Sequence, residues 1–196
     1  MVKELSVLLV AGWTSGTSVY LTAAIVGIAG RMGWMKLPGA LDTLQNPFII
    51  ALAVLIYAVE FVADKIPLVD SAWDAAHTFI RPAAAAAAGY LGGTEYGPAA
   101  QTGLALLTGT IALDAHALKS TTRLAINTSP EPFSNIGASL AEHSFVIFLF
   151  WFFIKHPVLA CALVALLIVA SFFIVRLLWR FAAALFRRIS GREATA

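Results

Sequence analysis

Ionisable side chains at helical spacing are concentrated in one stretch of the chain, EFVADKIPLVDSAWDAAHTFIRP, which covers residues 60 to 82. A helix turns by about 100° per residue, so that four of these side chains fall on one stripe along three turns. The four are Asp70, Asp74, His77 and Arg81. Carboxylates bind protons and cations, and an imidazole, whose unperturbed pKa is roughly 6.5, can relay a proton near neutral pH. The stretch therefore predicts proton or cation binding.

Further charged residues extend this pattern on both sides. Glu60 and Asp64 lie one helical turn apart on the preceding apolar segment. A later segment carries a mostly cationic stripe, which consists of Gln101, Thr108, His116, Lys119 and Arg123. We expect the acidic and cationic stripes to face each other, with Arg81, Lys119 and Arg123 as counter-ions or as holders of an anionic group. The second stripe is equally compatible with a helix end, where cations complement the helix dipole.

The composition indicates an integral membrane protein. Of 196 residues, 60% are hydrophobic and 12% are charged, whereas about a quarter are charged in a typical soluble domain. Cys161 is the single cysteine, which excludes an intramolecular disulfide. The basic residues at the C-terminal end follow an apolar helix, which favours a cytoplasmic anchor over nucleic-acid binding; they are Arg176, Arg180, Arg187, Arg188 and Arg192.

The apolar runs predict an all-α membrane protein with about six transmembrane or partly re-entrant helices. The expected helices cover residues 5–30, 47–63, 68–93, 98–120, a fifth that opens at 144–154, and 158–186. Small and hydroxyl residues in GWTSGTS (12 to 18) allow either close helix approach or a local break in the first helix, and Pro82 compromises the third helix. The segment from 122 to 143, TRLAINTSPEPFSNIGASLAEH, is expected to be the longest polar loop.

A faint internal repeat divides the single membrane domain (1–196) into halves at 5–93 and 98–186, followed by a basic tail at 187–196. NPF then KIP in the first half corresponds to EPF then KHP in the second. Each half holds three segments, an odd number, so the halves would be inverted, as in many transporters. The positive-inside rule then places both termini in the cytoplasm, with the protein in a bacterial inner membrane.

Alternatives to an interior site are also open. Residues 64–81 could form an interfacial helix whose stripe faces water, with Lys65 and Arg81 reaching the headgroups. Asp114 and His116 lie two apart on a helix and cannot share one metal ion, so a metal site would need ligands from several segments. The sequence contains no catalytic nucleophile motif and no cofactor-binding fingerprint, and we expect no cofactor.

Two long motifs carry a resemblance to a known family. EFVADKIPLVDSAWDAAHTFIRP and SPEPFSN resemble the signature of a bacterial membrane family catalogued as domain of unknown function 4126, over roughly residues 10 to 180. No activity is implied by this resemblance. It implies that the pattern includes Glu60, Asp64, Lys65, Pro67, Asp70, Trp73, Asp74, His77, Arg81, Pro82, Ser129, Pro130, Glu131, Pro132, Phe133 and Asn135. The run E-x-x-x-D-K also resembles the E-x-G-D-K motif of a six-helix cation-exchanger family, with one residue more and no glycine.

These patterns predict transport of a small ion or small solute, coupled to protonation of carboxylates near Asp74 and His77. The residues expected to bind substrate or ion are Glu60, Asp64, Asp70, Asp74, His77, Arg81, His116, Lys119, Arg123, Glu131 and Asn135. The alternative is a lipid-binding or lipid-moving module, or a structural subunit of a membrane complex. A membrane-embedded enzyme would instead gather Glu131, Glu142 and His143 against Asp70 and Asp74. The expected partners are the lipid bilayer, an unidentified small ion or solute, and a second copy of the chain in a homo-oligomer.

Overall fold

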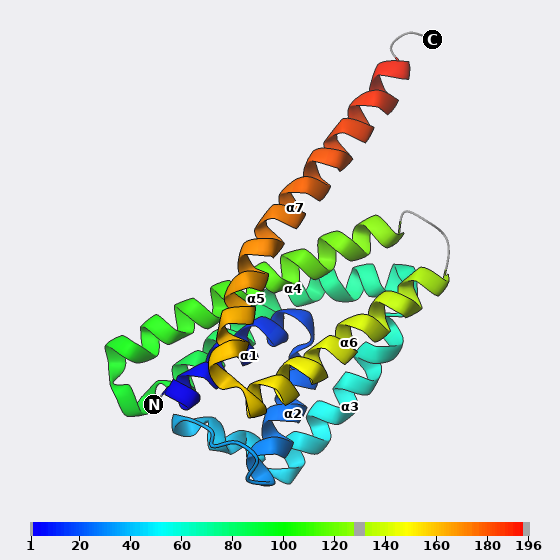
Figure 1. Ribbon diagram of the computed structural model, residues 1–196. Coiled ribbons are helices and arrows are strands. Elements are labelled where there is room, and N and C mark those ends of the chain that lie inside the picture. The colour runs from blue at the N-terminus through cyan, green and yellow to red at the C-terminus, as the bar shows by residue number, and fades with distance from the viewer. Residues whose placement is uncertain (1, 128–131, 194–196) are drawn as a thin grey trace.

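The computed structural model describes residues 2–127 and 132–193, and this part of the chain consists of helices joined by short non-helical segments (Figure 1). Its elements, in chain order, are α1 (Val2–Thr17), α2 (Val19–Arg31), η1 (Gly39–Gln45), α3 (Pro47–Ala63), α4 (Pro67–Gly92), η2 (Thr94–Tyr96), α5 (Pro98–Asn127), α6 (Pro132–Lys155) and α7 (Pro157–Glu193). The short helix α1 packs against α2, α4, α5, α6 and α7 and so forms the centre of the bundle. The long helix α7 leaves the bundle at its C-terminal end.

Proline sets where five of these helices begin. Pro47, Pro67, Pro98, Pro132 and Pro157 are each the first residue of a helix. The first helical turn needs no N–H donor, and the fixed φ of proline suits that position. The prolines of the faint repeat therefore mark corresponding helix starts in the two halves. An inverted relation between the halves does not follow from this and stays a prediction.

The prediction of a long loop at residues 122–143 is wrong. Helix α5 continues to Asn127, and α6 already begins at Pro132. The segment looked like a loop because it is polar, yet Arg123 and Asn135 are almost fully buried and bond to each other inside the bundle. Polar side chains with partners in the interior are as compatible with a helix as apolar ones. Pro82 likewise lies within an uninterrupted α4.

The first expected helix is broken at Ser18, which is one of the two outcomes that the GWTSGTS segment allowed. This residue is extended, with φ −153° and ψ 102°, and it separates α1 from α2. Its hydroxyl accepts a hydrogen bond from the Leu21 N–H as an N-cap and donates to the buried carboxylate of Glu60. The free backbone groups at the break are thus stabilised inside the protein, as a break at membrane depth requires.

Small residues hold the helices close together. A Cβ atom on Gly16 of α1 would overlap the Ala112 carbonyl of α5 and lie 2.7 Å from the Ala115 Cβ. A Cβ atom on Gly89 of α4 would overlap the Leu104 carbonyl region of α5, which it would approach to 2.5 Å. Glycine at such sites permits the close backbone approach typical of membrane helices.

We expect Gly16→Ala to lower the free energy of unfolding by about 1–3 kcal/mol, because the methyl group forces α1 and α5 apart. The matched control is Gly103→Ala on α5, where nothing lies within 4 Å of the added Cβ. This control should be neutral or more stable, since alanine is a better helix former than glycine by about 1 kcal/mol. The free energies of unfolding of both variants can be measured in mixed detergent micelles, with tryptophan fluorescence as the signal for unfolding. Equal stability of the two variants would show that the α1–α5 contact is not tight.

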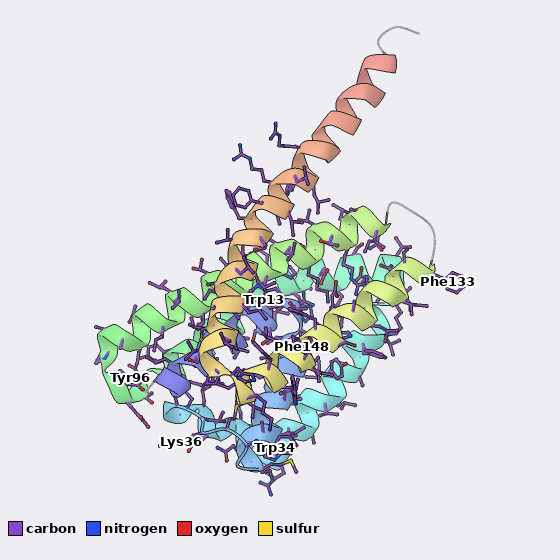
Figure 2. The ribbon with its side chains drawn as sticks, in the orientation of Figure 1. Trp13, Trp34, Lys36, Tyr96, Phe133 and Phe148 are labelled. Carbon is purple, nitrogen blue, oxygen red and sulfur yellow. The ribbon has the colours of Figure 1, made fainter. Side chains whose placement is uncertain are left out.

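The helices indicate a membrane protein. In the described part of the chain, two helical stretches are long and apolar enough to cross a bilayer, Phe133–Lys155 and Pro157–Arg180. A third is possible if η1 and α3, which are bent by 73° relative to each other, act as one span. Large apolar side chains such as Phe133 and Phe148 point outward from α6 (Figure 2), as expected of a lipid-facing surface. By length and composition alone, the six expected spans are not established.

Candidate functional site

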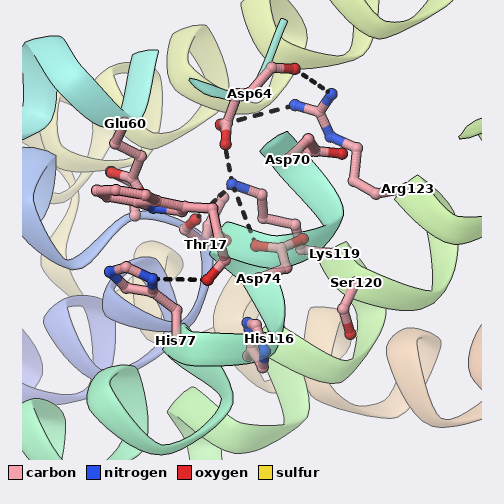
Figure 3. Close-up of polar contacts among 12 residues, drawn as sticks. Thr17, Glu60, Asp64, Asp70, Asp74, His77, His116, Lys119, Ser120 and Arg123 are labelled. Atoms are coloured by element: carbon pink, nitrogen blue, oxygen red, sulfur yellow. Dashed lines mark hydrogen bonds and ion pairs between the residues drawn. The ribbon is translucent and has the colours of Figure 1, made fainter. Parts of the chain in front are cut away.

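Charged and polar side chains from four helices meet in the interior of the bundle (Figure 3). We call this cluster the buried network. Its members are Glu60 and Asp64 from α3, Asp70, Asp74, His77 and Arg81 from α4, His116, Lys119 and Arg123 from α5, and Asn135, Glu142 and His143 from α6. All are buried except Glu142, which is partly exposed. Burial of so many ionisable groups is costly and is typical of functional sites in membrane proteins.

The stripe on α4 faces the protein interior. The exposed fractions of Asp70, Asp74, His77 and Arg81 are 0%, 4%, 3% and 0%. The alternative of an interfacial helix with this stripe in water is therefore wrong, because an amphipathic surface helix would expose these side chains. The helix-end alternative for the α5 stripe is also wrong. His116, Lys119 and Arg123 are buried against the acidic groups.

Arg81 is the centre of one half of the network. Its Nη2 donates to Glu60 Oε1 at 2.8 Å, and its Nη1 donates to Asp74 Oδ1 at 2.9 Å. The same Nη1 lies 2.8 Å from His116 Nδ1. One fully buried guanidinium thus joins α3, α4 and α5, which fits the predicted role of counter-ion.

Asp64 is the centre of the other half. Its Oδ2 accepts from Lys119 Nζ at 2.9 Å and lies 3.7 Å from Arg123 Nη2 and 3.5 Å from His143 Nε2. Arg123 in turn forms a two-point pair with Glu142, at 3.1 Å and 2.8 Å. Lys119 Nζ also lies 3.9 Å from Asp74 Oδ1, which links the two halves. The acidic and cationic stripes do face each other, as the sequence predicted.

Hydrogen-bond partners decide the proton positions on two histidines. Arg81 can only donate, so His116 Nδ1 is an acceptor and its Nε2–H donates to Thr78 Oγ1 at 3.0 Å. A second proton on His116 would face the guanidinium, so His116 serves as a neutral acceptor. His77 differs, because its Nδ1–H donates to the Trp73 carbonyl at 2.7 Å and its Nε2 lies 3.1 Å from the Tyr20 hydroxyl. A hydroxyl can donate or accept, so His77 Nε2 can gain and lose a proton without losing its partner.

Asn135 connects Asp70 to the rest of the network. Its side chain donates to Asn127 Oδ1 at 2.7 Å, and Asn127 donates to Asp70 Oδ2 at 3.1 Å. Arg123 donates to the Asn135 carbonyl at 3.1 Å. Of the predicted site residues, Glu131 lies outside the described residues, and the structure brings the other ten together.

The sequence interpretation missed several contacts. Ser18 and Tyr20 contact Glu60 and His77 from the break between α1 and α2, and Asn127 bridges α5 to Asp70. The hydroxyl-rich GWTSGTS segment was the one available signal for Ser18. Asn127 stood in the supposed loop, which hid its place on the inward face of α5.

The network carries more negative than positive charge. Five carboxylates (Glu60, Asp64, Asp70, Asp74 and Glu142) oppose three strong cations (Arg81, Lys119 and Arg123) when the histidines are neutral. Lys65 lies beside the cluster and is partly buried. Its Nζ donates a hydrogen bond to the Phe61 carbonyl at 2.7 Å. Even with Lys65 included, one negative charge stays uncompensated. Within the described part of the chain, three buried carboxylate oxygens also have no hydrogen-bond partner, namely Asp64 Oδ1, Asp70 Oδ1 and Asp74 Oδ2.

Two pockets reach the network from outside. One, of about 240 Å³, lies between α4 and α5 and includes Asp74 and Arg123 in its wall. The other, of about 530 Å³, lies among α1, α5, α6 and α7 and is mostly apolar, with Lys119 and Glu142 in its wall. Four members of the network therefore form part of the walls of these two pockets.

No group of three or more histidine, cysteine, aspartate or glutamate side chains suited to a metal ion occurs among the described residues. Asp114 points away from His116, as expected, and accepts a hydrogen bond from Ser171 of α7. The enzyme arrangement that the sequence left open is met only in part. Glu142 and His143 lie near Asp64, while Asp70 is bonded to Asn127.

Comparison with known proteins identifies the family. A family model described as "Domain of unknown function (DUF4126)" matches residues 5–177, so the chain belongs to this family, and the resemblance of the two motifs is confirmed. No curated protein and no solved structure matches the chain.

Proposed function

We propose that this member of the DUF4126 family moves a small ion or small solute across a membrane, coupled to protonation of the buried network. The observation that carries the proposal is the excess of buried carboxylates, three of which have an oxygen without a partner. A purely structural ion-pair network has no reason to hold uncompensated charge, because an unpaired buried charge is strongly destabilising. A proton or cation that enters the network removes this cost.

The packing of the helices suggests how protonation could drive a conformational change. Helices α4 and α5 contact each other along much of their length, whereas α3 meets α4 and α6 meets α5 at few positions. Arg81 to Glu60 and Lys119 to Asp64 are ion pairs that join α3 to this α4–α5 unit. Protonation of a carboxylate weakens such a pair and thereby loosens α3 from the unit. This gives the two-state element that coupled transport requires.

His77 is the proposed proton relay. It lies on α4 three residues after Asp74, and its Nε2, which faces the Tyr20 hydroxyl, is the imidazole nitrogen that can change protonation without losing its bond. His116, by contrast, supports the position of Arg81. We therefore propose that His116 positions Arg81 and does not itself bind the ion, whereas the sequence had predicted that it does.

The topology proposed for transport is six spans in two inverted halves, 5–93 and 98–186. The protein would lie in a bacterial inner membrane, with both termini on its cytoplasmic side. The corresponding helix-opening prolines support the halves, and Arg176 and Arg180 near the end of the α7 span support the orientation. In this arrangement the network lies at the interface of the halves, because α3 and α4 belong to one and α5 and α6 to the other.

A lipid-binding or lipid-moving module is the second candidate, favoured by a different pocket. This apolar pocket, of about 650 Å³, lies between α2 and α6, and its wall includes Trp34, Trp151 and Lys155. Tryptophan and lysine are common where helices meet the headgroup region. Such a groove suits an acyl chain, although it does not use the buried network.

Replacing His77 by glutamine is expected to lower proton-coupled flux by about tenfold or more, because glutamine can keep both hydrogen bonds but cannot carry a proton. The protein is reconstituted into liposomes that contain a pH-sensitive dye, and panels of inorganic salts and small solutes are added in turn. His156→Gln is the matched control, since His156 is exposed between α6 and α7. It should transport as the wild type does.

The same liposomes separate the two candidate functions. If no salt or solute moves protons in the wild type, while a fluorescent phospholipid changes leaflet only when the protein is present, the lipid-moving function replaces the transport proposal. Wild-type flux in His77→Gln would exclude His77 as the relay.

A further inference from the structure

Asp70 differs from the other carboxylates of the buried network in its partners. The other four each lie 2.8 to 2.9 Å from an arginine or lysine nitrogen. In the described part of the chain, Asp70 forms no ion pair at all. Its side chain is also shielded from water, because Asp70 is 0% exposed. An ionised Asp70 would therefore carry the uncompensated negative charge of the network.

Two asparagines in series supply a neutral hydrogen bond to Asp70. Arg123 can only donate, and its Nη1 lies 3.2 Å from Asn135 Oδ1, so this oxygen is the acceptor. The Asn135 amide nitrogen then donates to Asn127 Oδ1 at 2.7 Å, and the Asn127 amide nitrogen donates to Asp70 Oδ2 at 3.1 Å. The guanidinium thus fixes the direction of both amides, and Asp70 Oδ2 receives a donor without a formal charge.

The second oxygen of this carboxyl group is the place for a proton. Asp70 Oδ1 is buried and has no hydrogen-bond partner among the described residues. A buried carboxylate without a counter-ion normally binds a proton, because a neutral hydroxyl is far less costly to bury than a charge. With this proton in place, the four other carboxylates of the network equal in number its three strong cations together with Lys65.

Charged groups on three helices act on Asp70. Asp74 on α4 and Asp64 on α3 repel a negative charge at this position, whereas Arg123 on α5 attracts it. The Arg123 guanidinium is already engaged with both oxygens of Glu142, at 3.1 Å and 2.8 Å. Repulsion by two carboxylates and complete burial therefore act together to favour a proton on Asp70.

Asp70 is linked to an exposed side chain through one intervening residue. The Asn127 amide nitrogen that donates to Asp70 also donates to Ser71 Oγ at 3.0 Å, and Ser71 is exposed. Asp70 lies in the first turn of α4, and Asn127 is the last residue of α5, so this contact is at one end of both helices. This position gives a proton a short path between the surface and the carboxyl group.

We propose that Asp70 is the residue of the buried network that takes up and releases the proton, at Oδ1, while Asn127 stays bonded to Oδ2. This inference rests on the proposed function and names the carboxylate through which protonation acts. Uptake forms one O–H bond and removes one negative charge. Release restores that charge where α4, α5 and α6 meet, because Asn127 belongs to α5 and Asn135 to α6.

Thermal unfolding of the full chain in detergent, followed from about pH 5 to about pH 8, tests the proton on Asp70. An aspartate in the unfolded chain releases its proton near about pH 3.9, so the folded chain would hold one proton more than the unfolded chain above that pH. Stability then falls as the pH rises, until the folded chain also releases the proton. The unfolding temperature of the wild type should therefore fall by a few degrees relative to that of Asp70→Asn.

The Asp70→Asn variant keeps an oxygen for the Asn127 donor and removes the charge. It should unfold at a higher temperature than the wild type at pH 8 and at a similar temperature at pH 5. Asp64→Asn is the matched comparison inside the network, and it should unfold at a lower temperature because it leaves Lys119 without its closest partner. Asp42→Asn, at an exposed position, is the control and should behave as the wild type does.

Infrared spectroscopy of the same samples detects the proton directly, since a protonated carboxyl group and a carboxylate absorb at different frequencies. The wild type should lose a protonated-carboxyl band as the pH rises, and Asp70→Asn should not contain this band. If Asp70→Asn does not fold, Asn127→Ala takes its place. It removes a donor that favours the charged form, so the band should persist to a pH that is higher by about one unit, a tenfold change in proton affinity.

Each outcome decides the inference. A difference in unfolding temperature between the wild type and Asp70→Asn that does not change with pH overturns the proton on Asp70. A titrating band that remains in Asp70→Asn, or one that Asn127→Ala does not shift, also overturns it. If the band and the pH dependence belong to Asp70 but no salt or solute moves protons in liposomes, the proton site stands and the proposed transport fails. If Asp70→Asn transports protons as the wild type does, the proposed transport stands and this inference fails.

Discussion

Arg81→Gln is expected to lower the free energy of unfolding by about 3–5 kcal/mol, the loss typical of breaking a buried ion pair on one side. Arg81 is fully buried and donates to Glu60 and Asp74, which are also buried. The substitution leaves Glu60 without its cation and Asp74 with only the more distant Lys119, at 3.9 Å, and the loss of one positive charge enlarges the negative excess. It also removes the donor that fixes His116 Nδ1.

Two further variants make this result specific. Adding Glu60→Gln to Arg81→Gln should recover roughly half of the loss, because two neutral amides can bond to each other at little electrostatic cost. Arg31→Gln is the control, since Arg31 is exposed and bonds to the Gln45 carbonyl at 3.3 Å. Arg31→Gln should change the free energy of unfolding by less than about 1 kcal/mol. Equal effects at positions 31 and 81, measured by unfolding in mixed micelles, would mean that water already screens the network.

Lys119→Gln is the second substitution with a large expected effect, and it should also lower the free energy of unfolding by about 3–5 kcal/mol. The Lys119 ammonium lies within 4 Å of three carboxylates, at 2.9 Å from Asp64, 3.9 Å from Asp74 and 3.8 Å from Glu142. Asp64 would keep only the more distant Arg123, at 3.7 Å, together with a neutral His143. The variant therefore leaves its main uncompensated charge at Asp64.

The location of that charge can be tested with a second substitution. Asp64→Asn combined with Lys119→Gln should be more stable than Lys119→Gln alone, so that the two substitutions are strongly non-additive. Lys155→Gln at the exposed end of α6 is the control and should change stability little. If adding Asp64→Asn destabilises the Lys119→Gln protein further, Asp64 is held by groups other than Lys119, and the arrangement of this half of the network is incorrect.

Much of the site followed from helical spacing. Asp70, Asp74, His77 and Arg81 recur at intervals of three and four, which predicted one stripe, and that stripe is buried. The same reasoning placed His116, Lys119 and Arg123 on one face. Helix boundaries close to Pro47, Pro67, Pro98 and Pro157 were also predicted, whereas the helix that begins at Pro132 was missed because this proline lay in the supposed loop.

Polarity misled the interpretation of residues 122–143. A polar segment between apolar runs normally indicates a loop, but here Arg123 donates hydrogen bonds to both Asn135 and Glu142 within a helical bundle. Local sequence cannot distinguish a solvated polar residue from a buried one with a partner. That distinction depends on which residues other helices bring within hydrogen-bond distance.

The sequence by itself determined an all-helical chain of membrane character, helix boundaries close to four of the prolines, and the two polar stripes. These are properties of composition and of spacing along one helix. Only the tertiary structure decided that the first helix breaks at Ser18, that the stripes face inward, that Arg81 joins Glu60 to Asp74, and that His116 and His77 differ in their capacity for a proton. The physical reason is that each of these facts depends on distances between residues far apart in the chain, and such distances are set by how the helices pack.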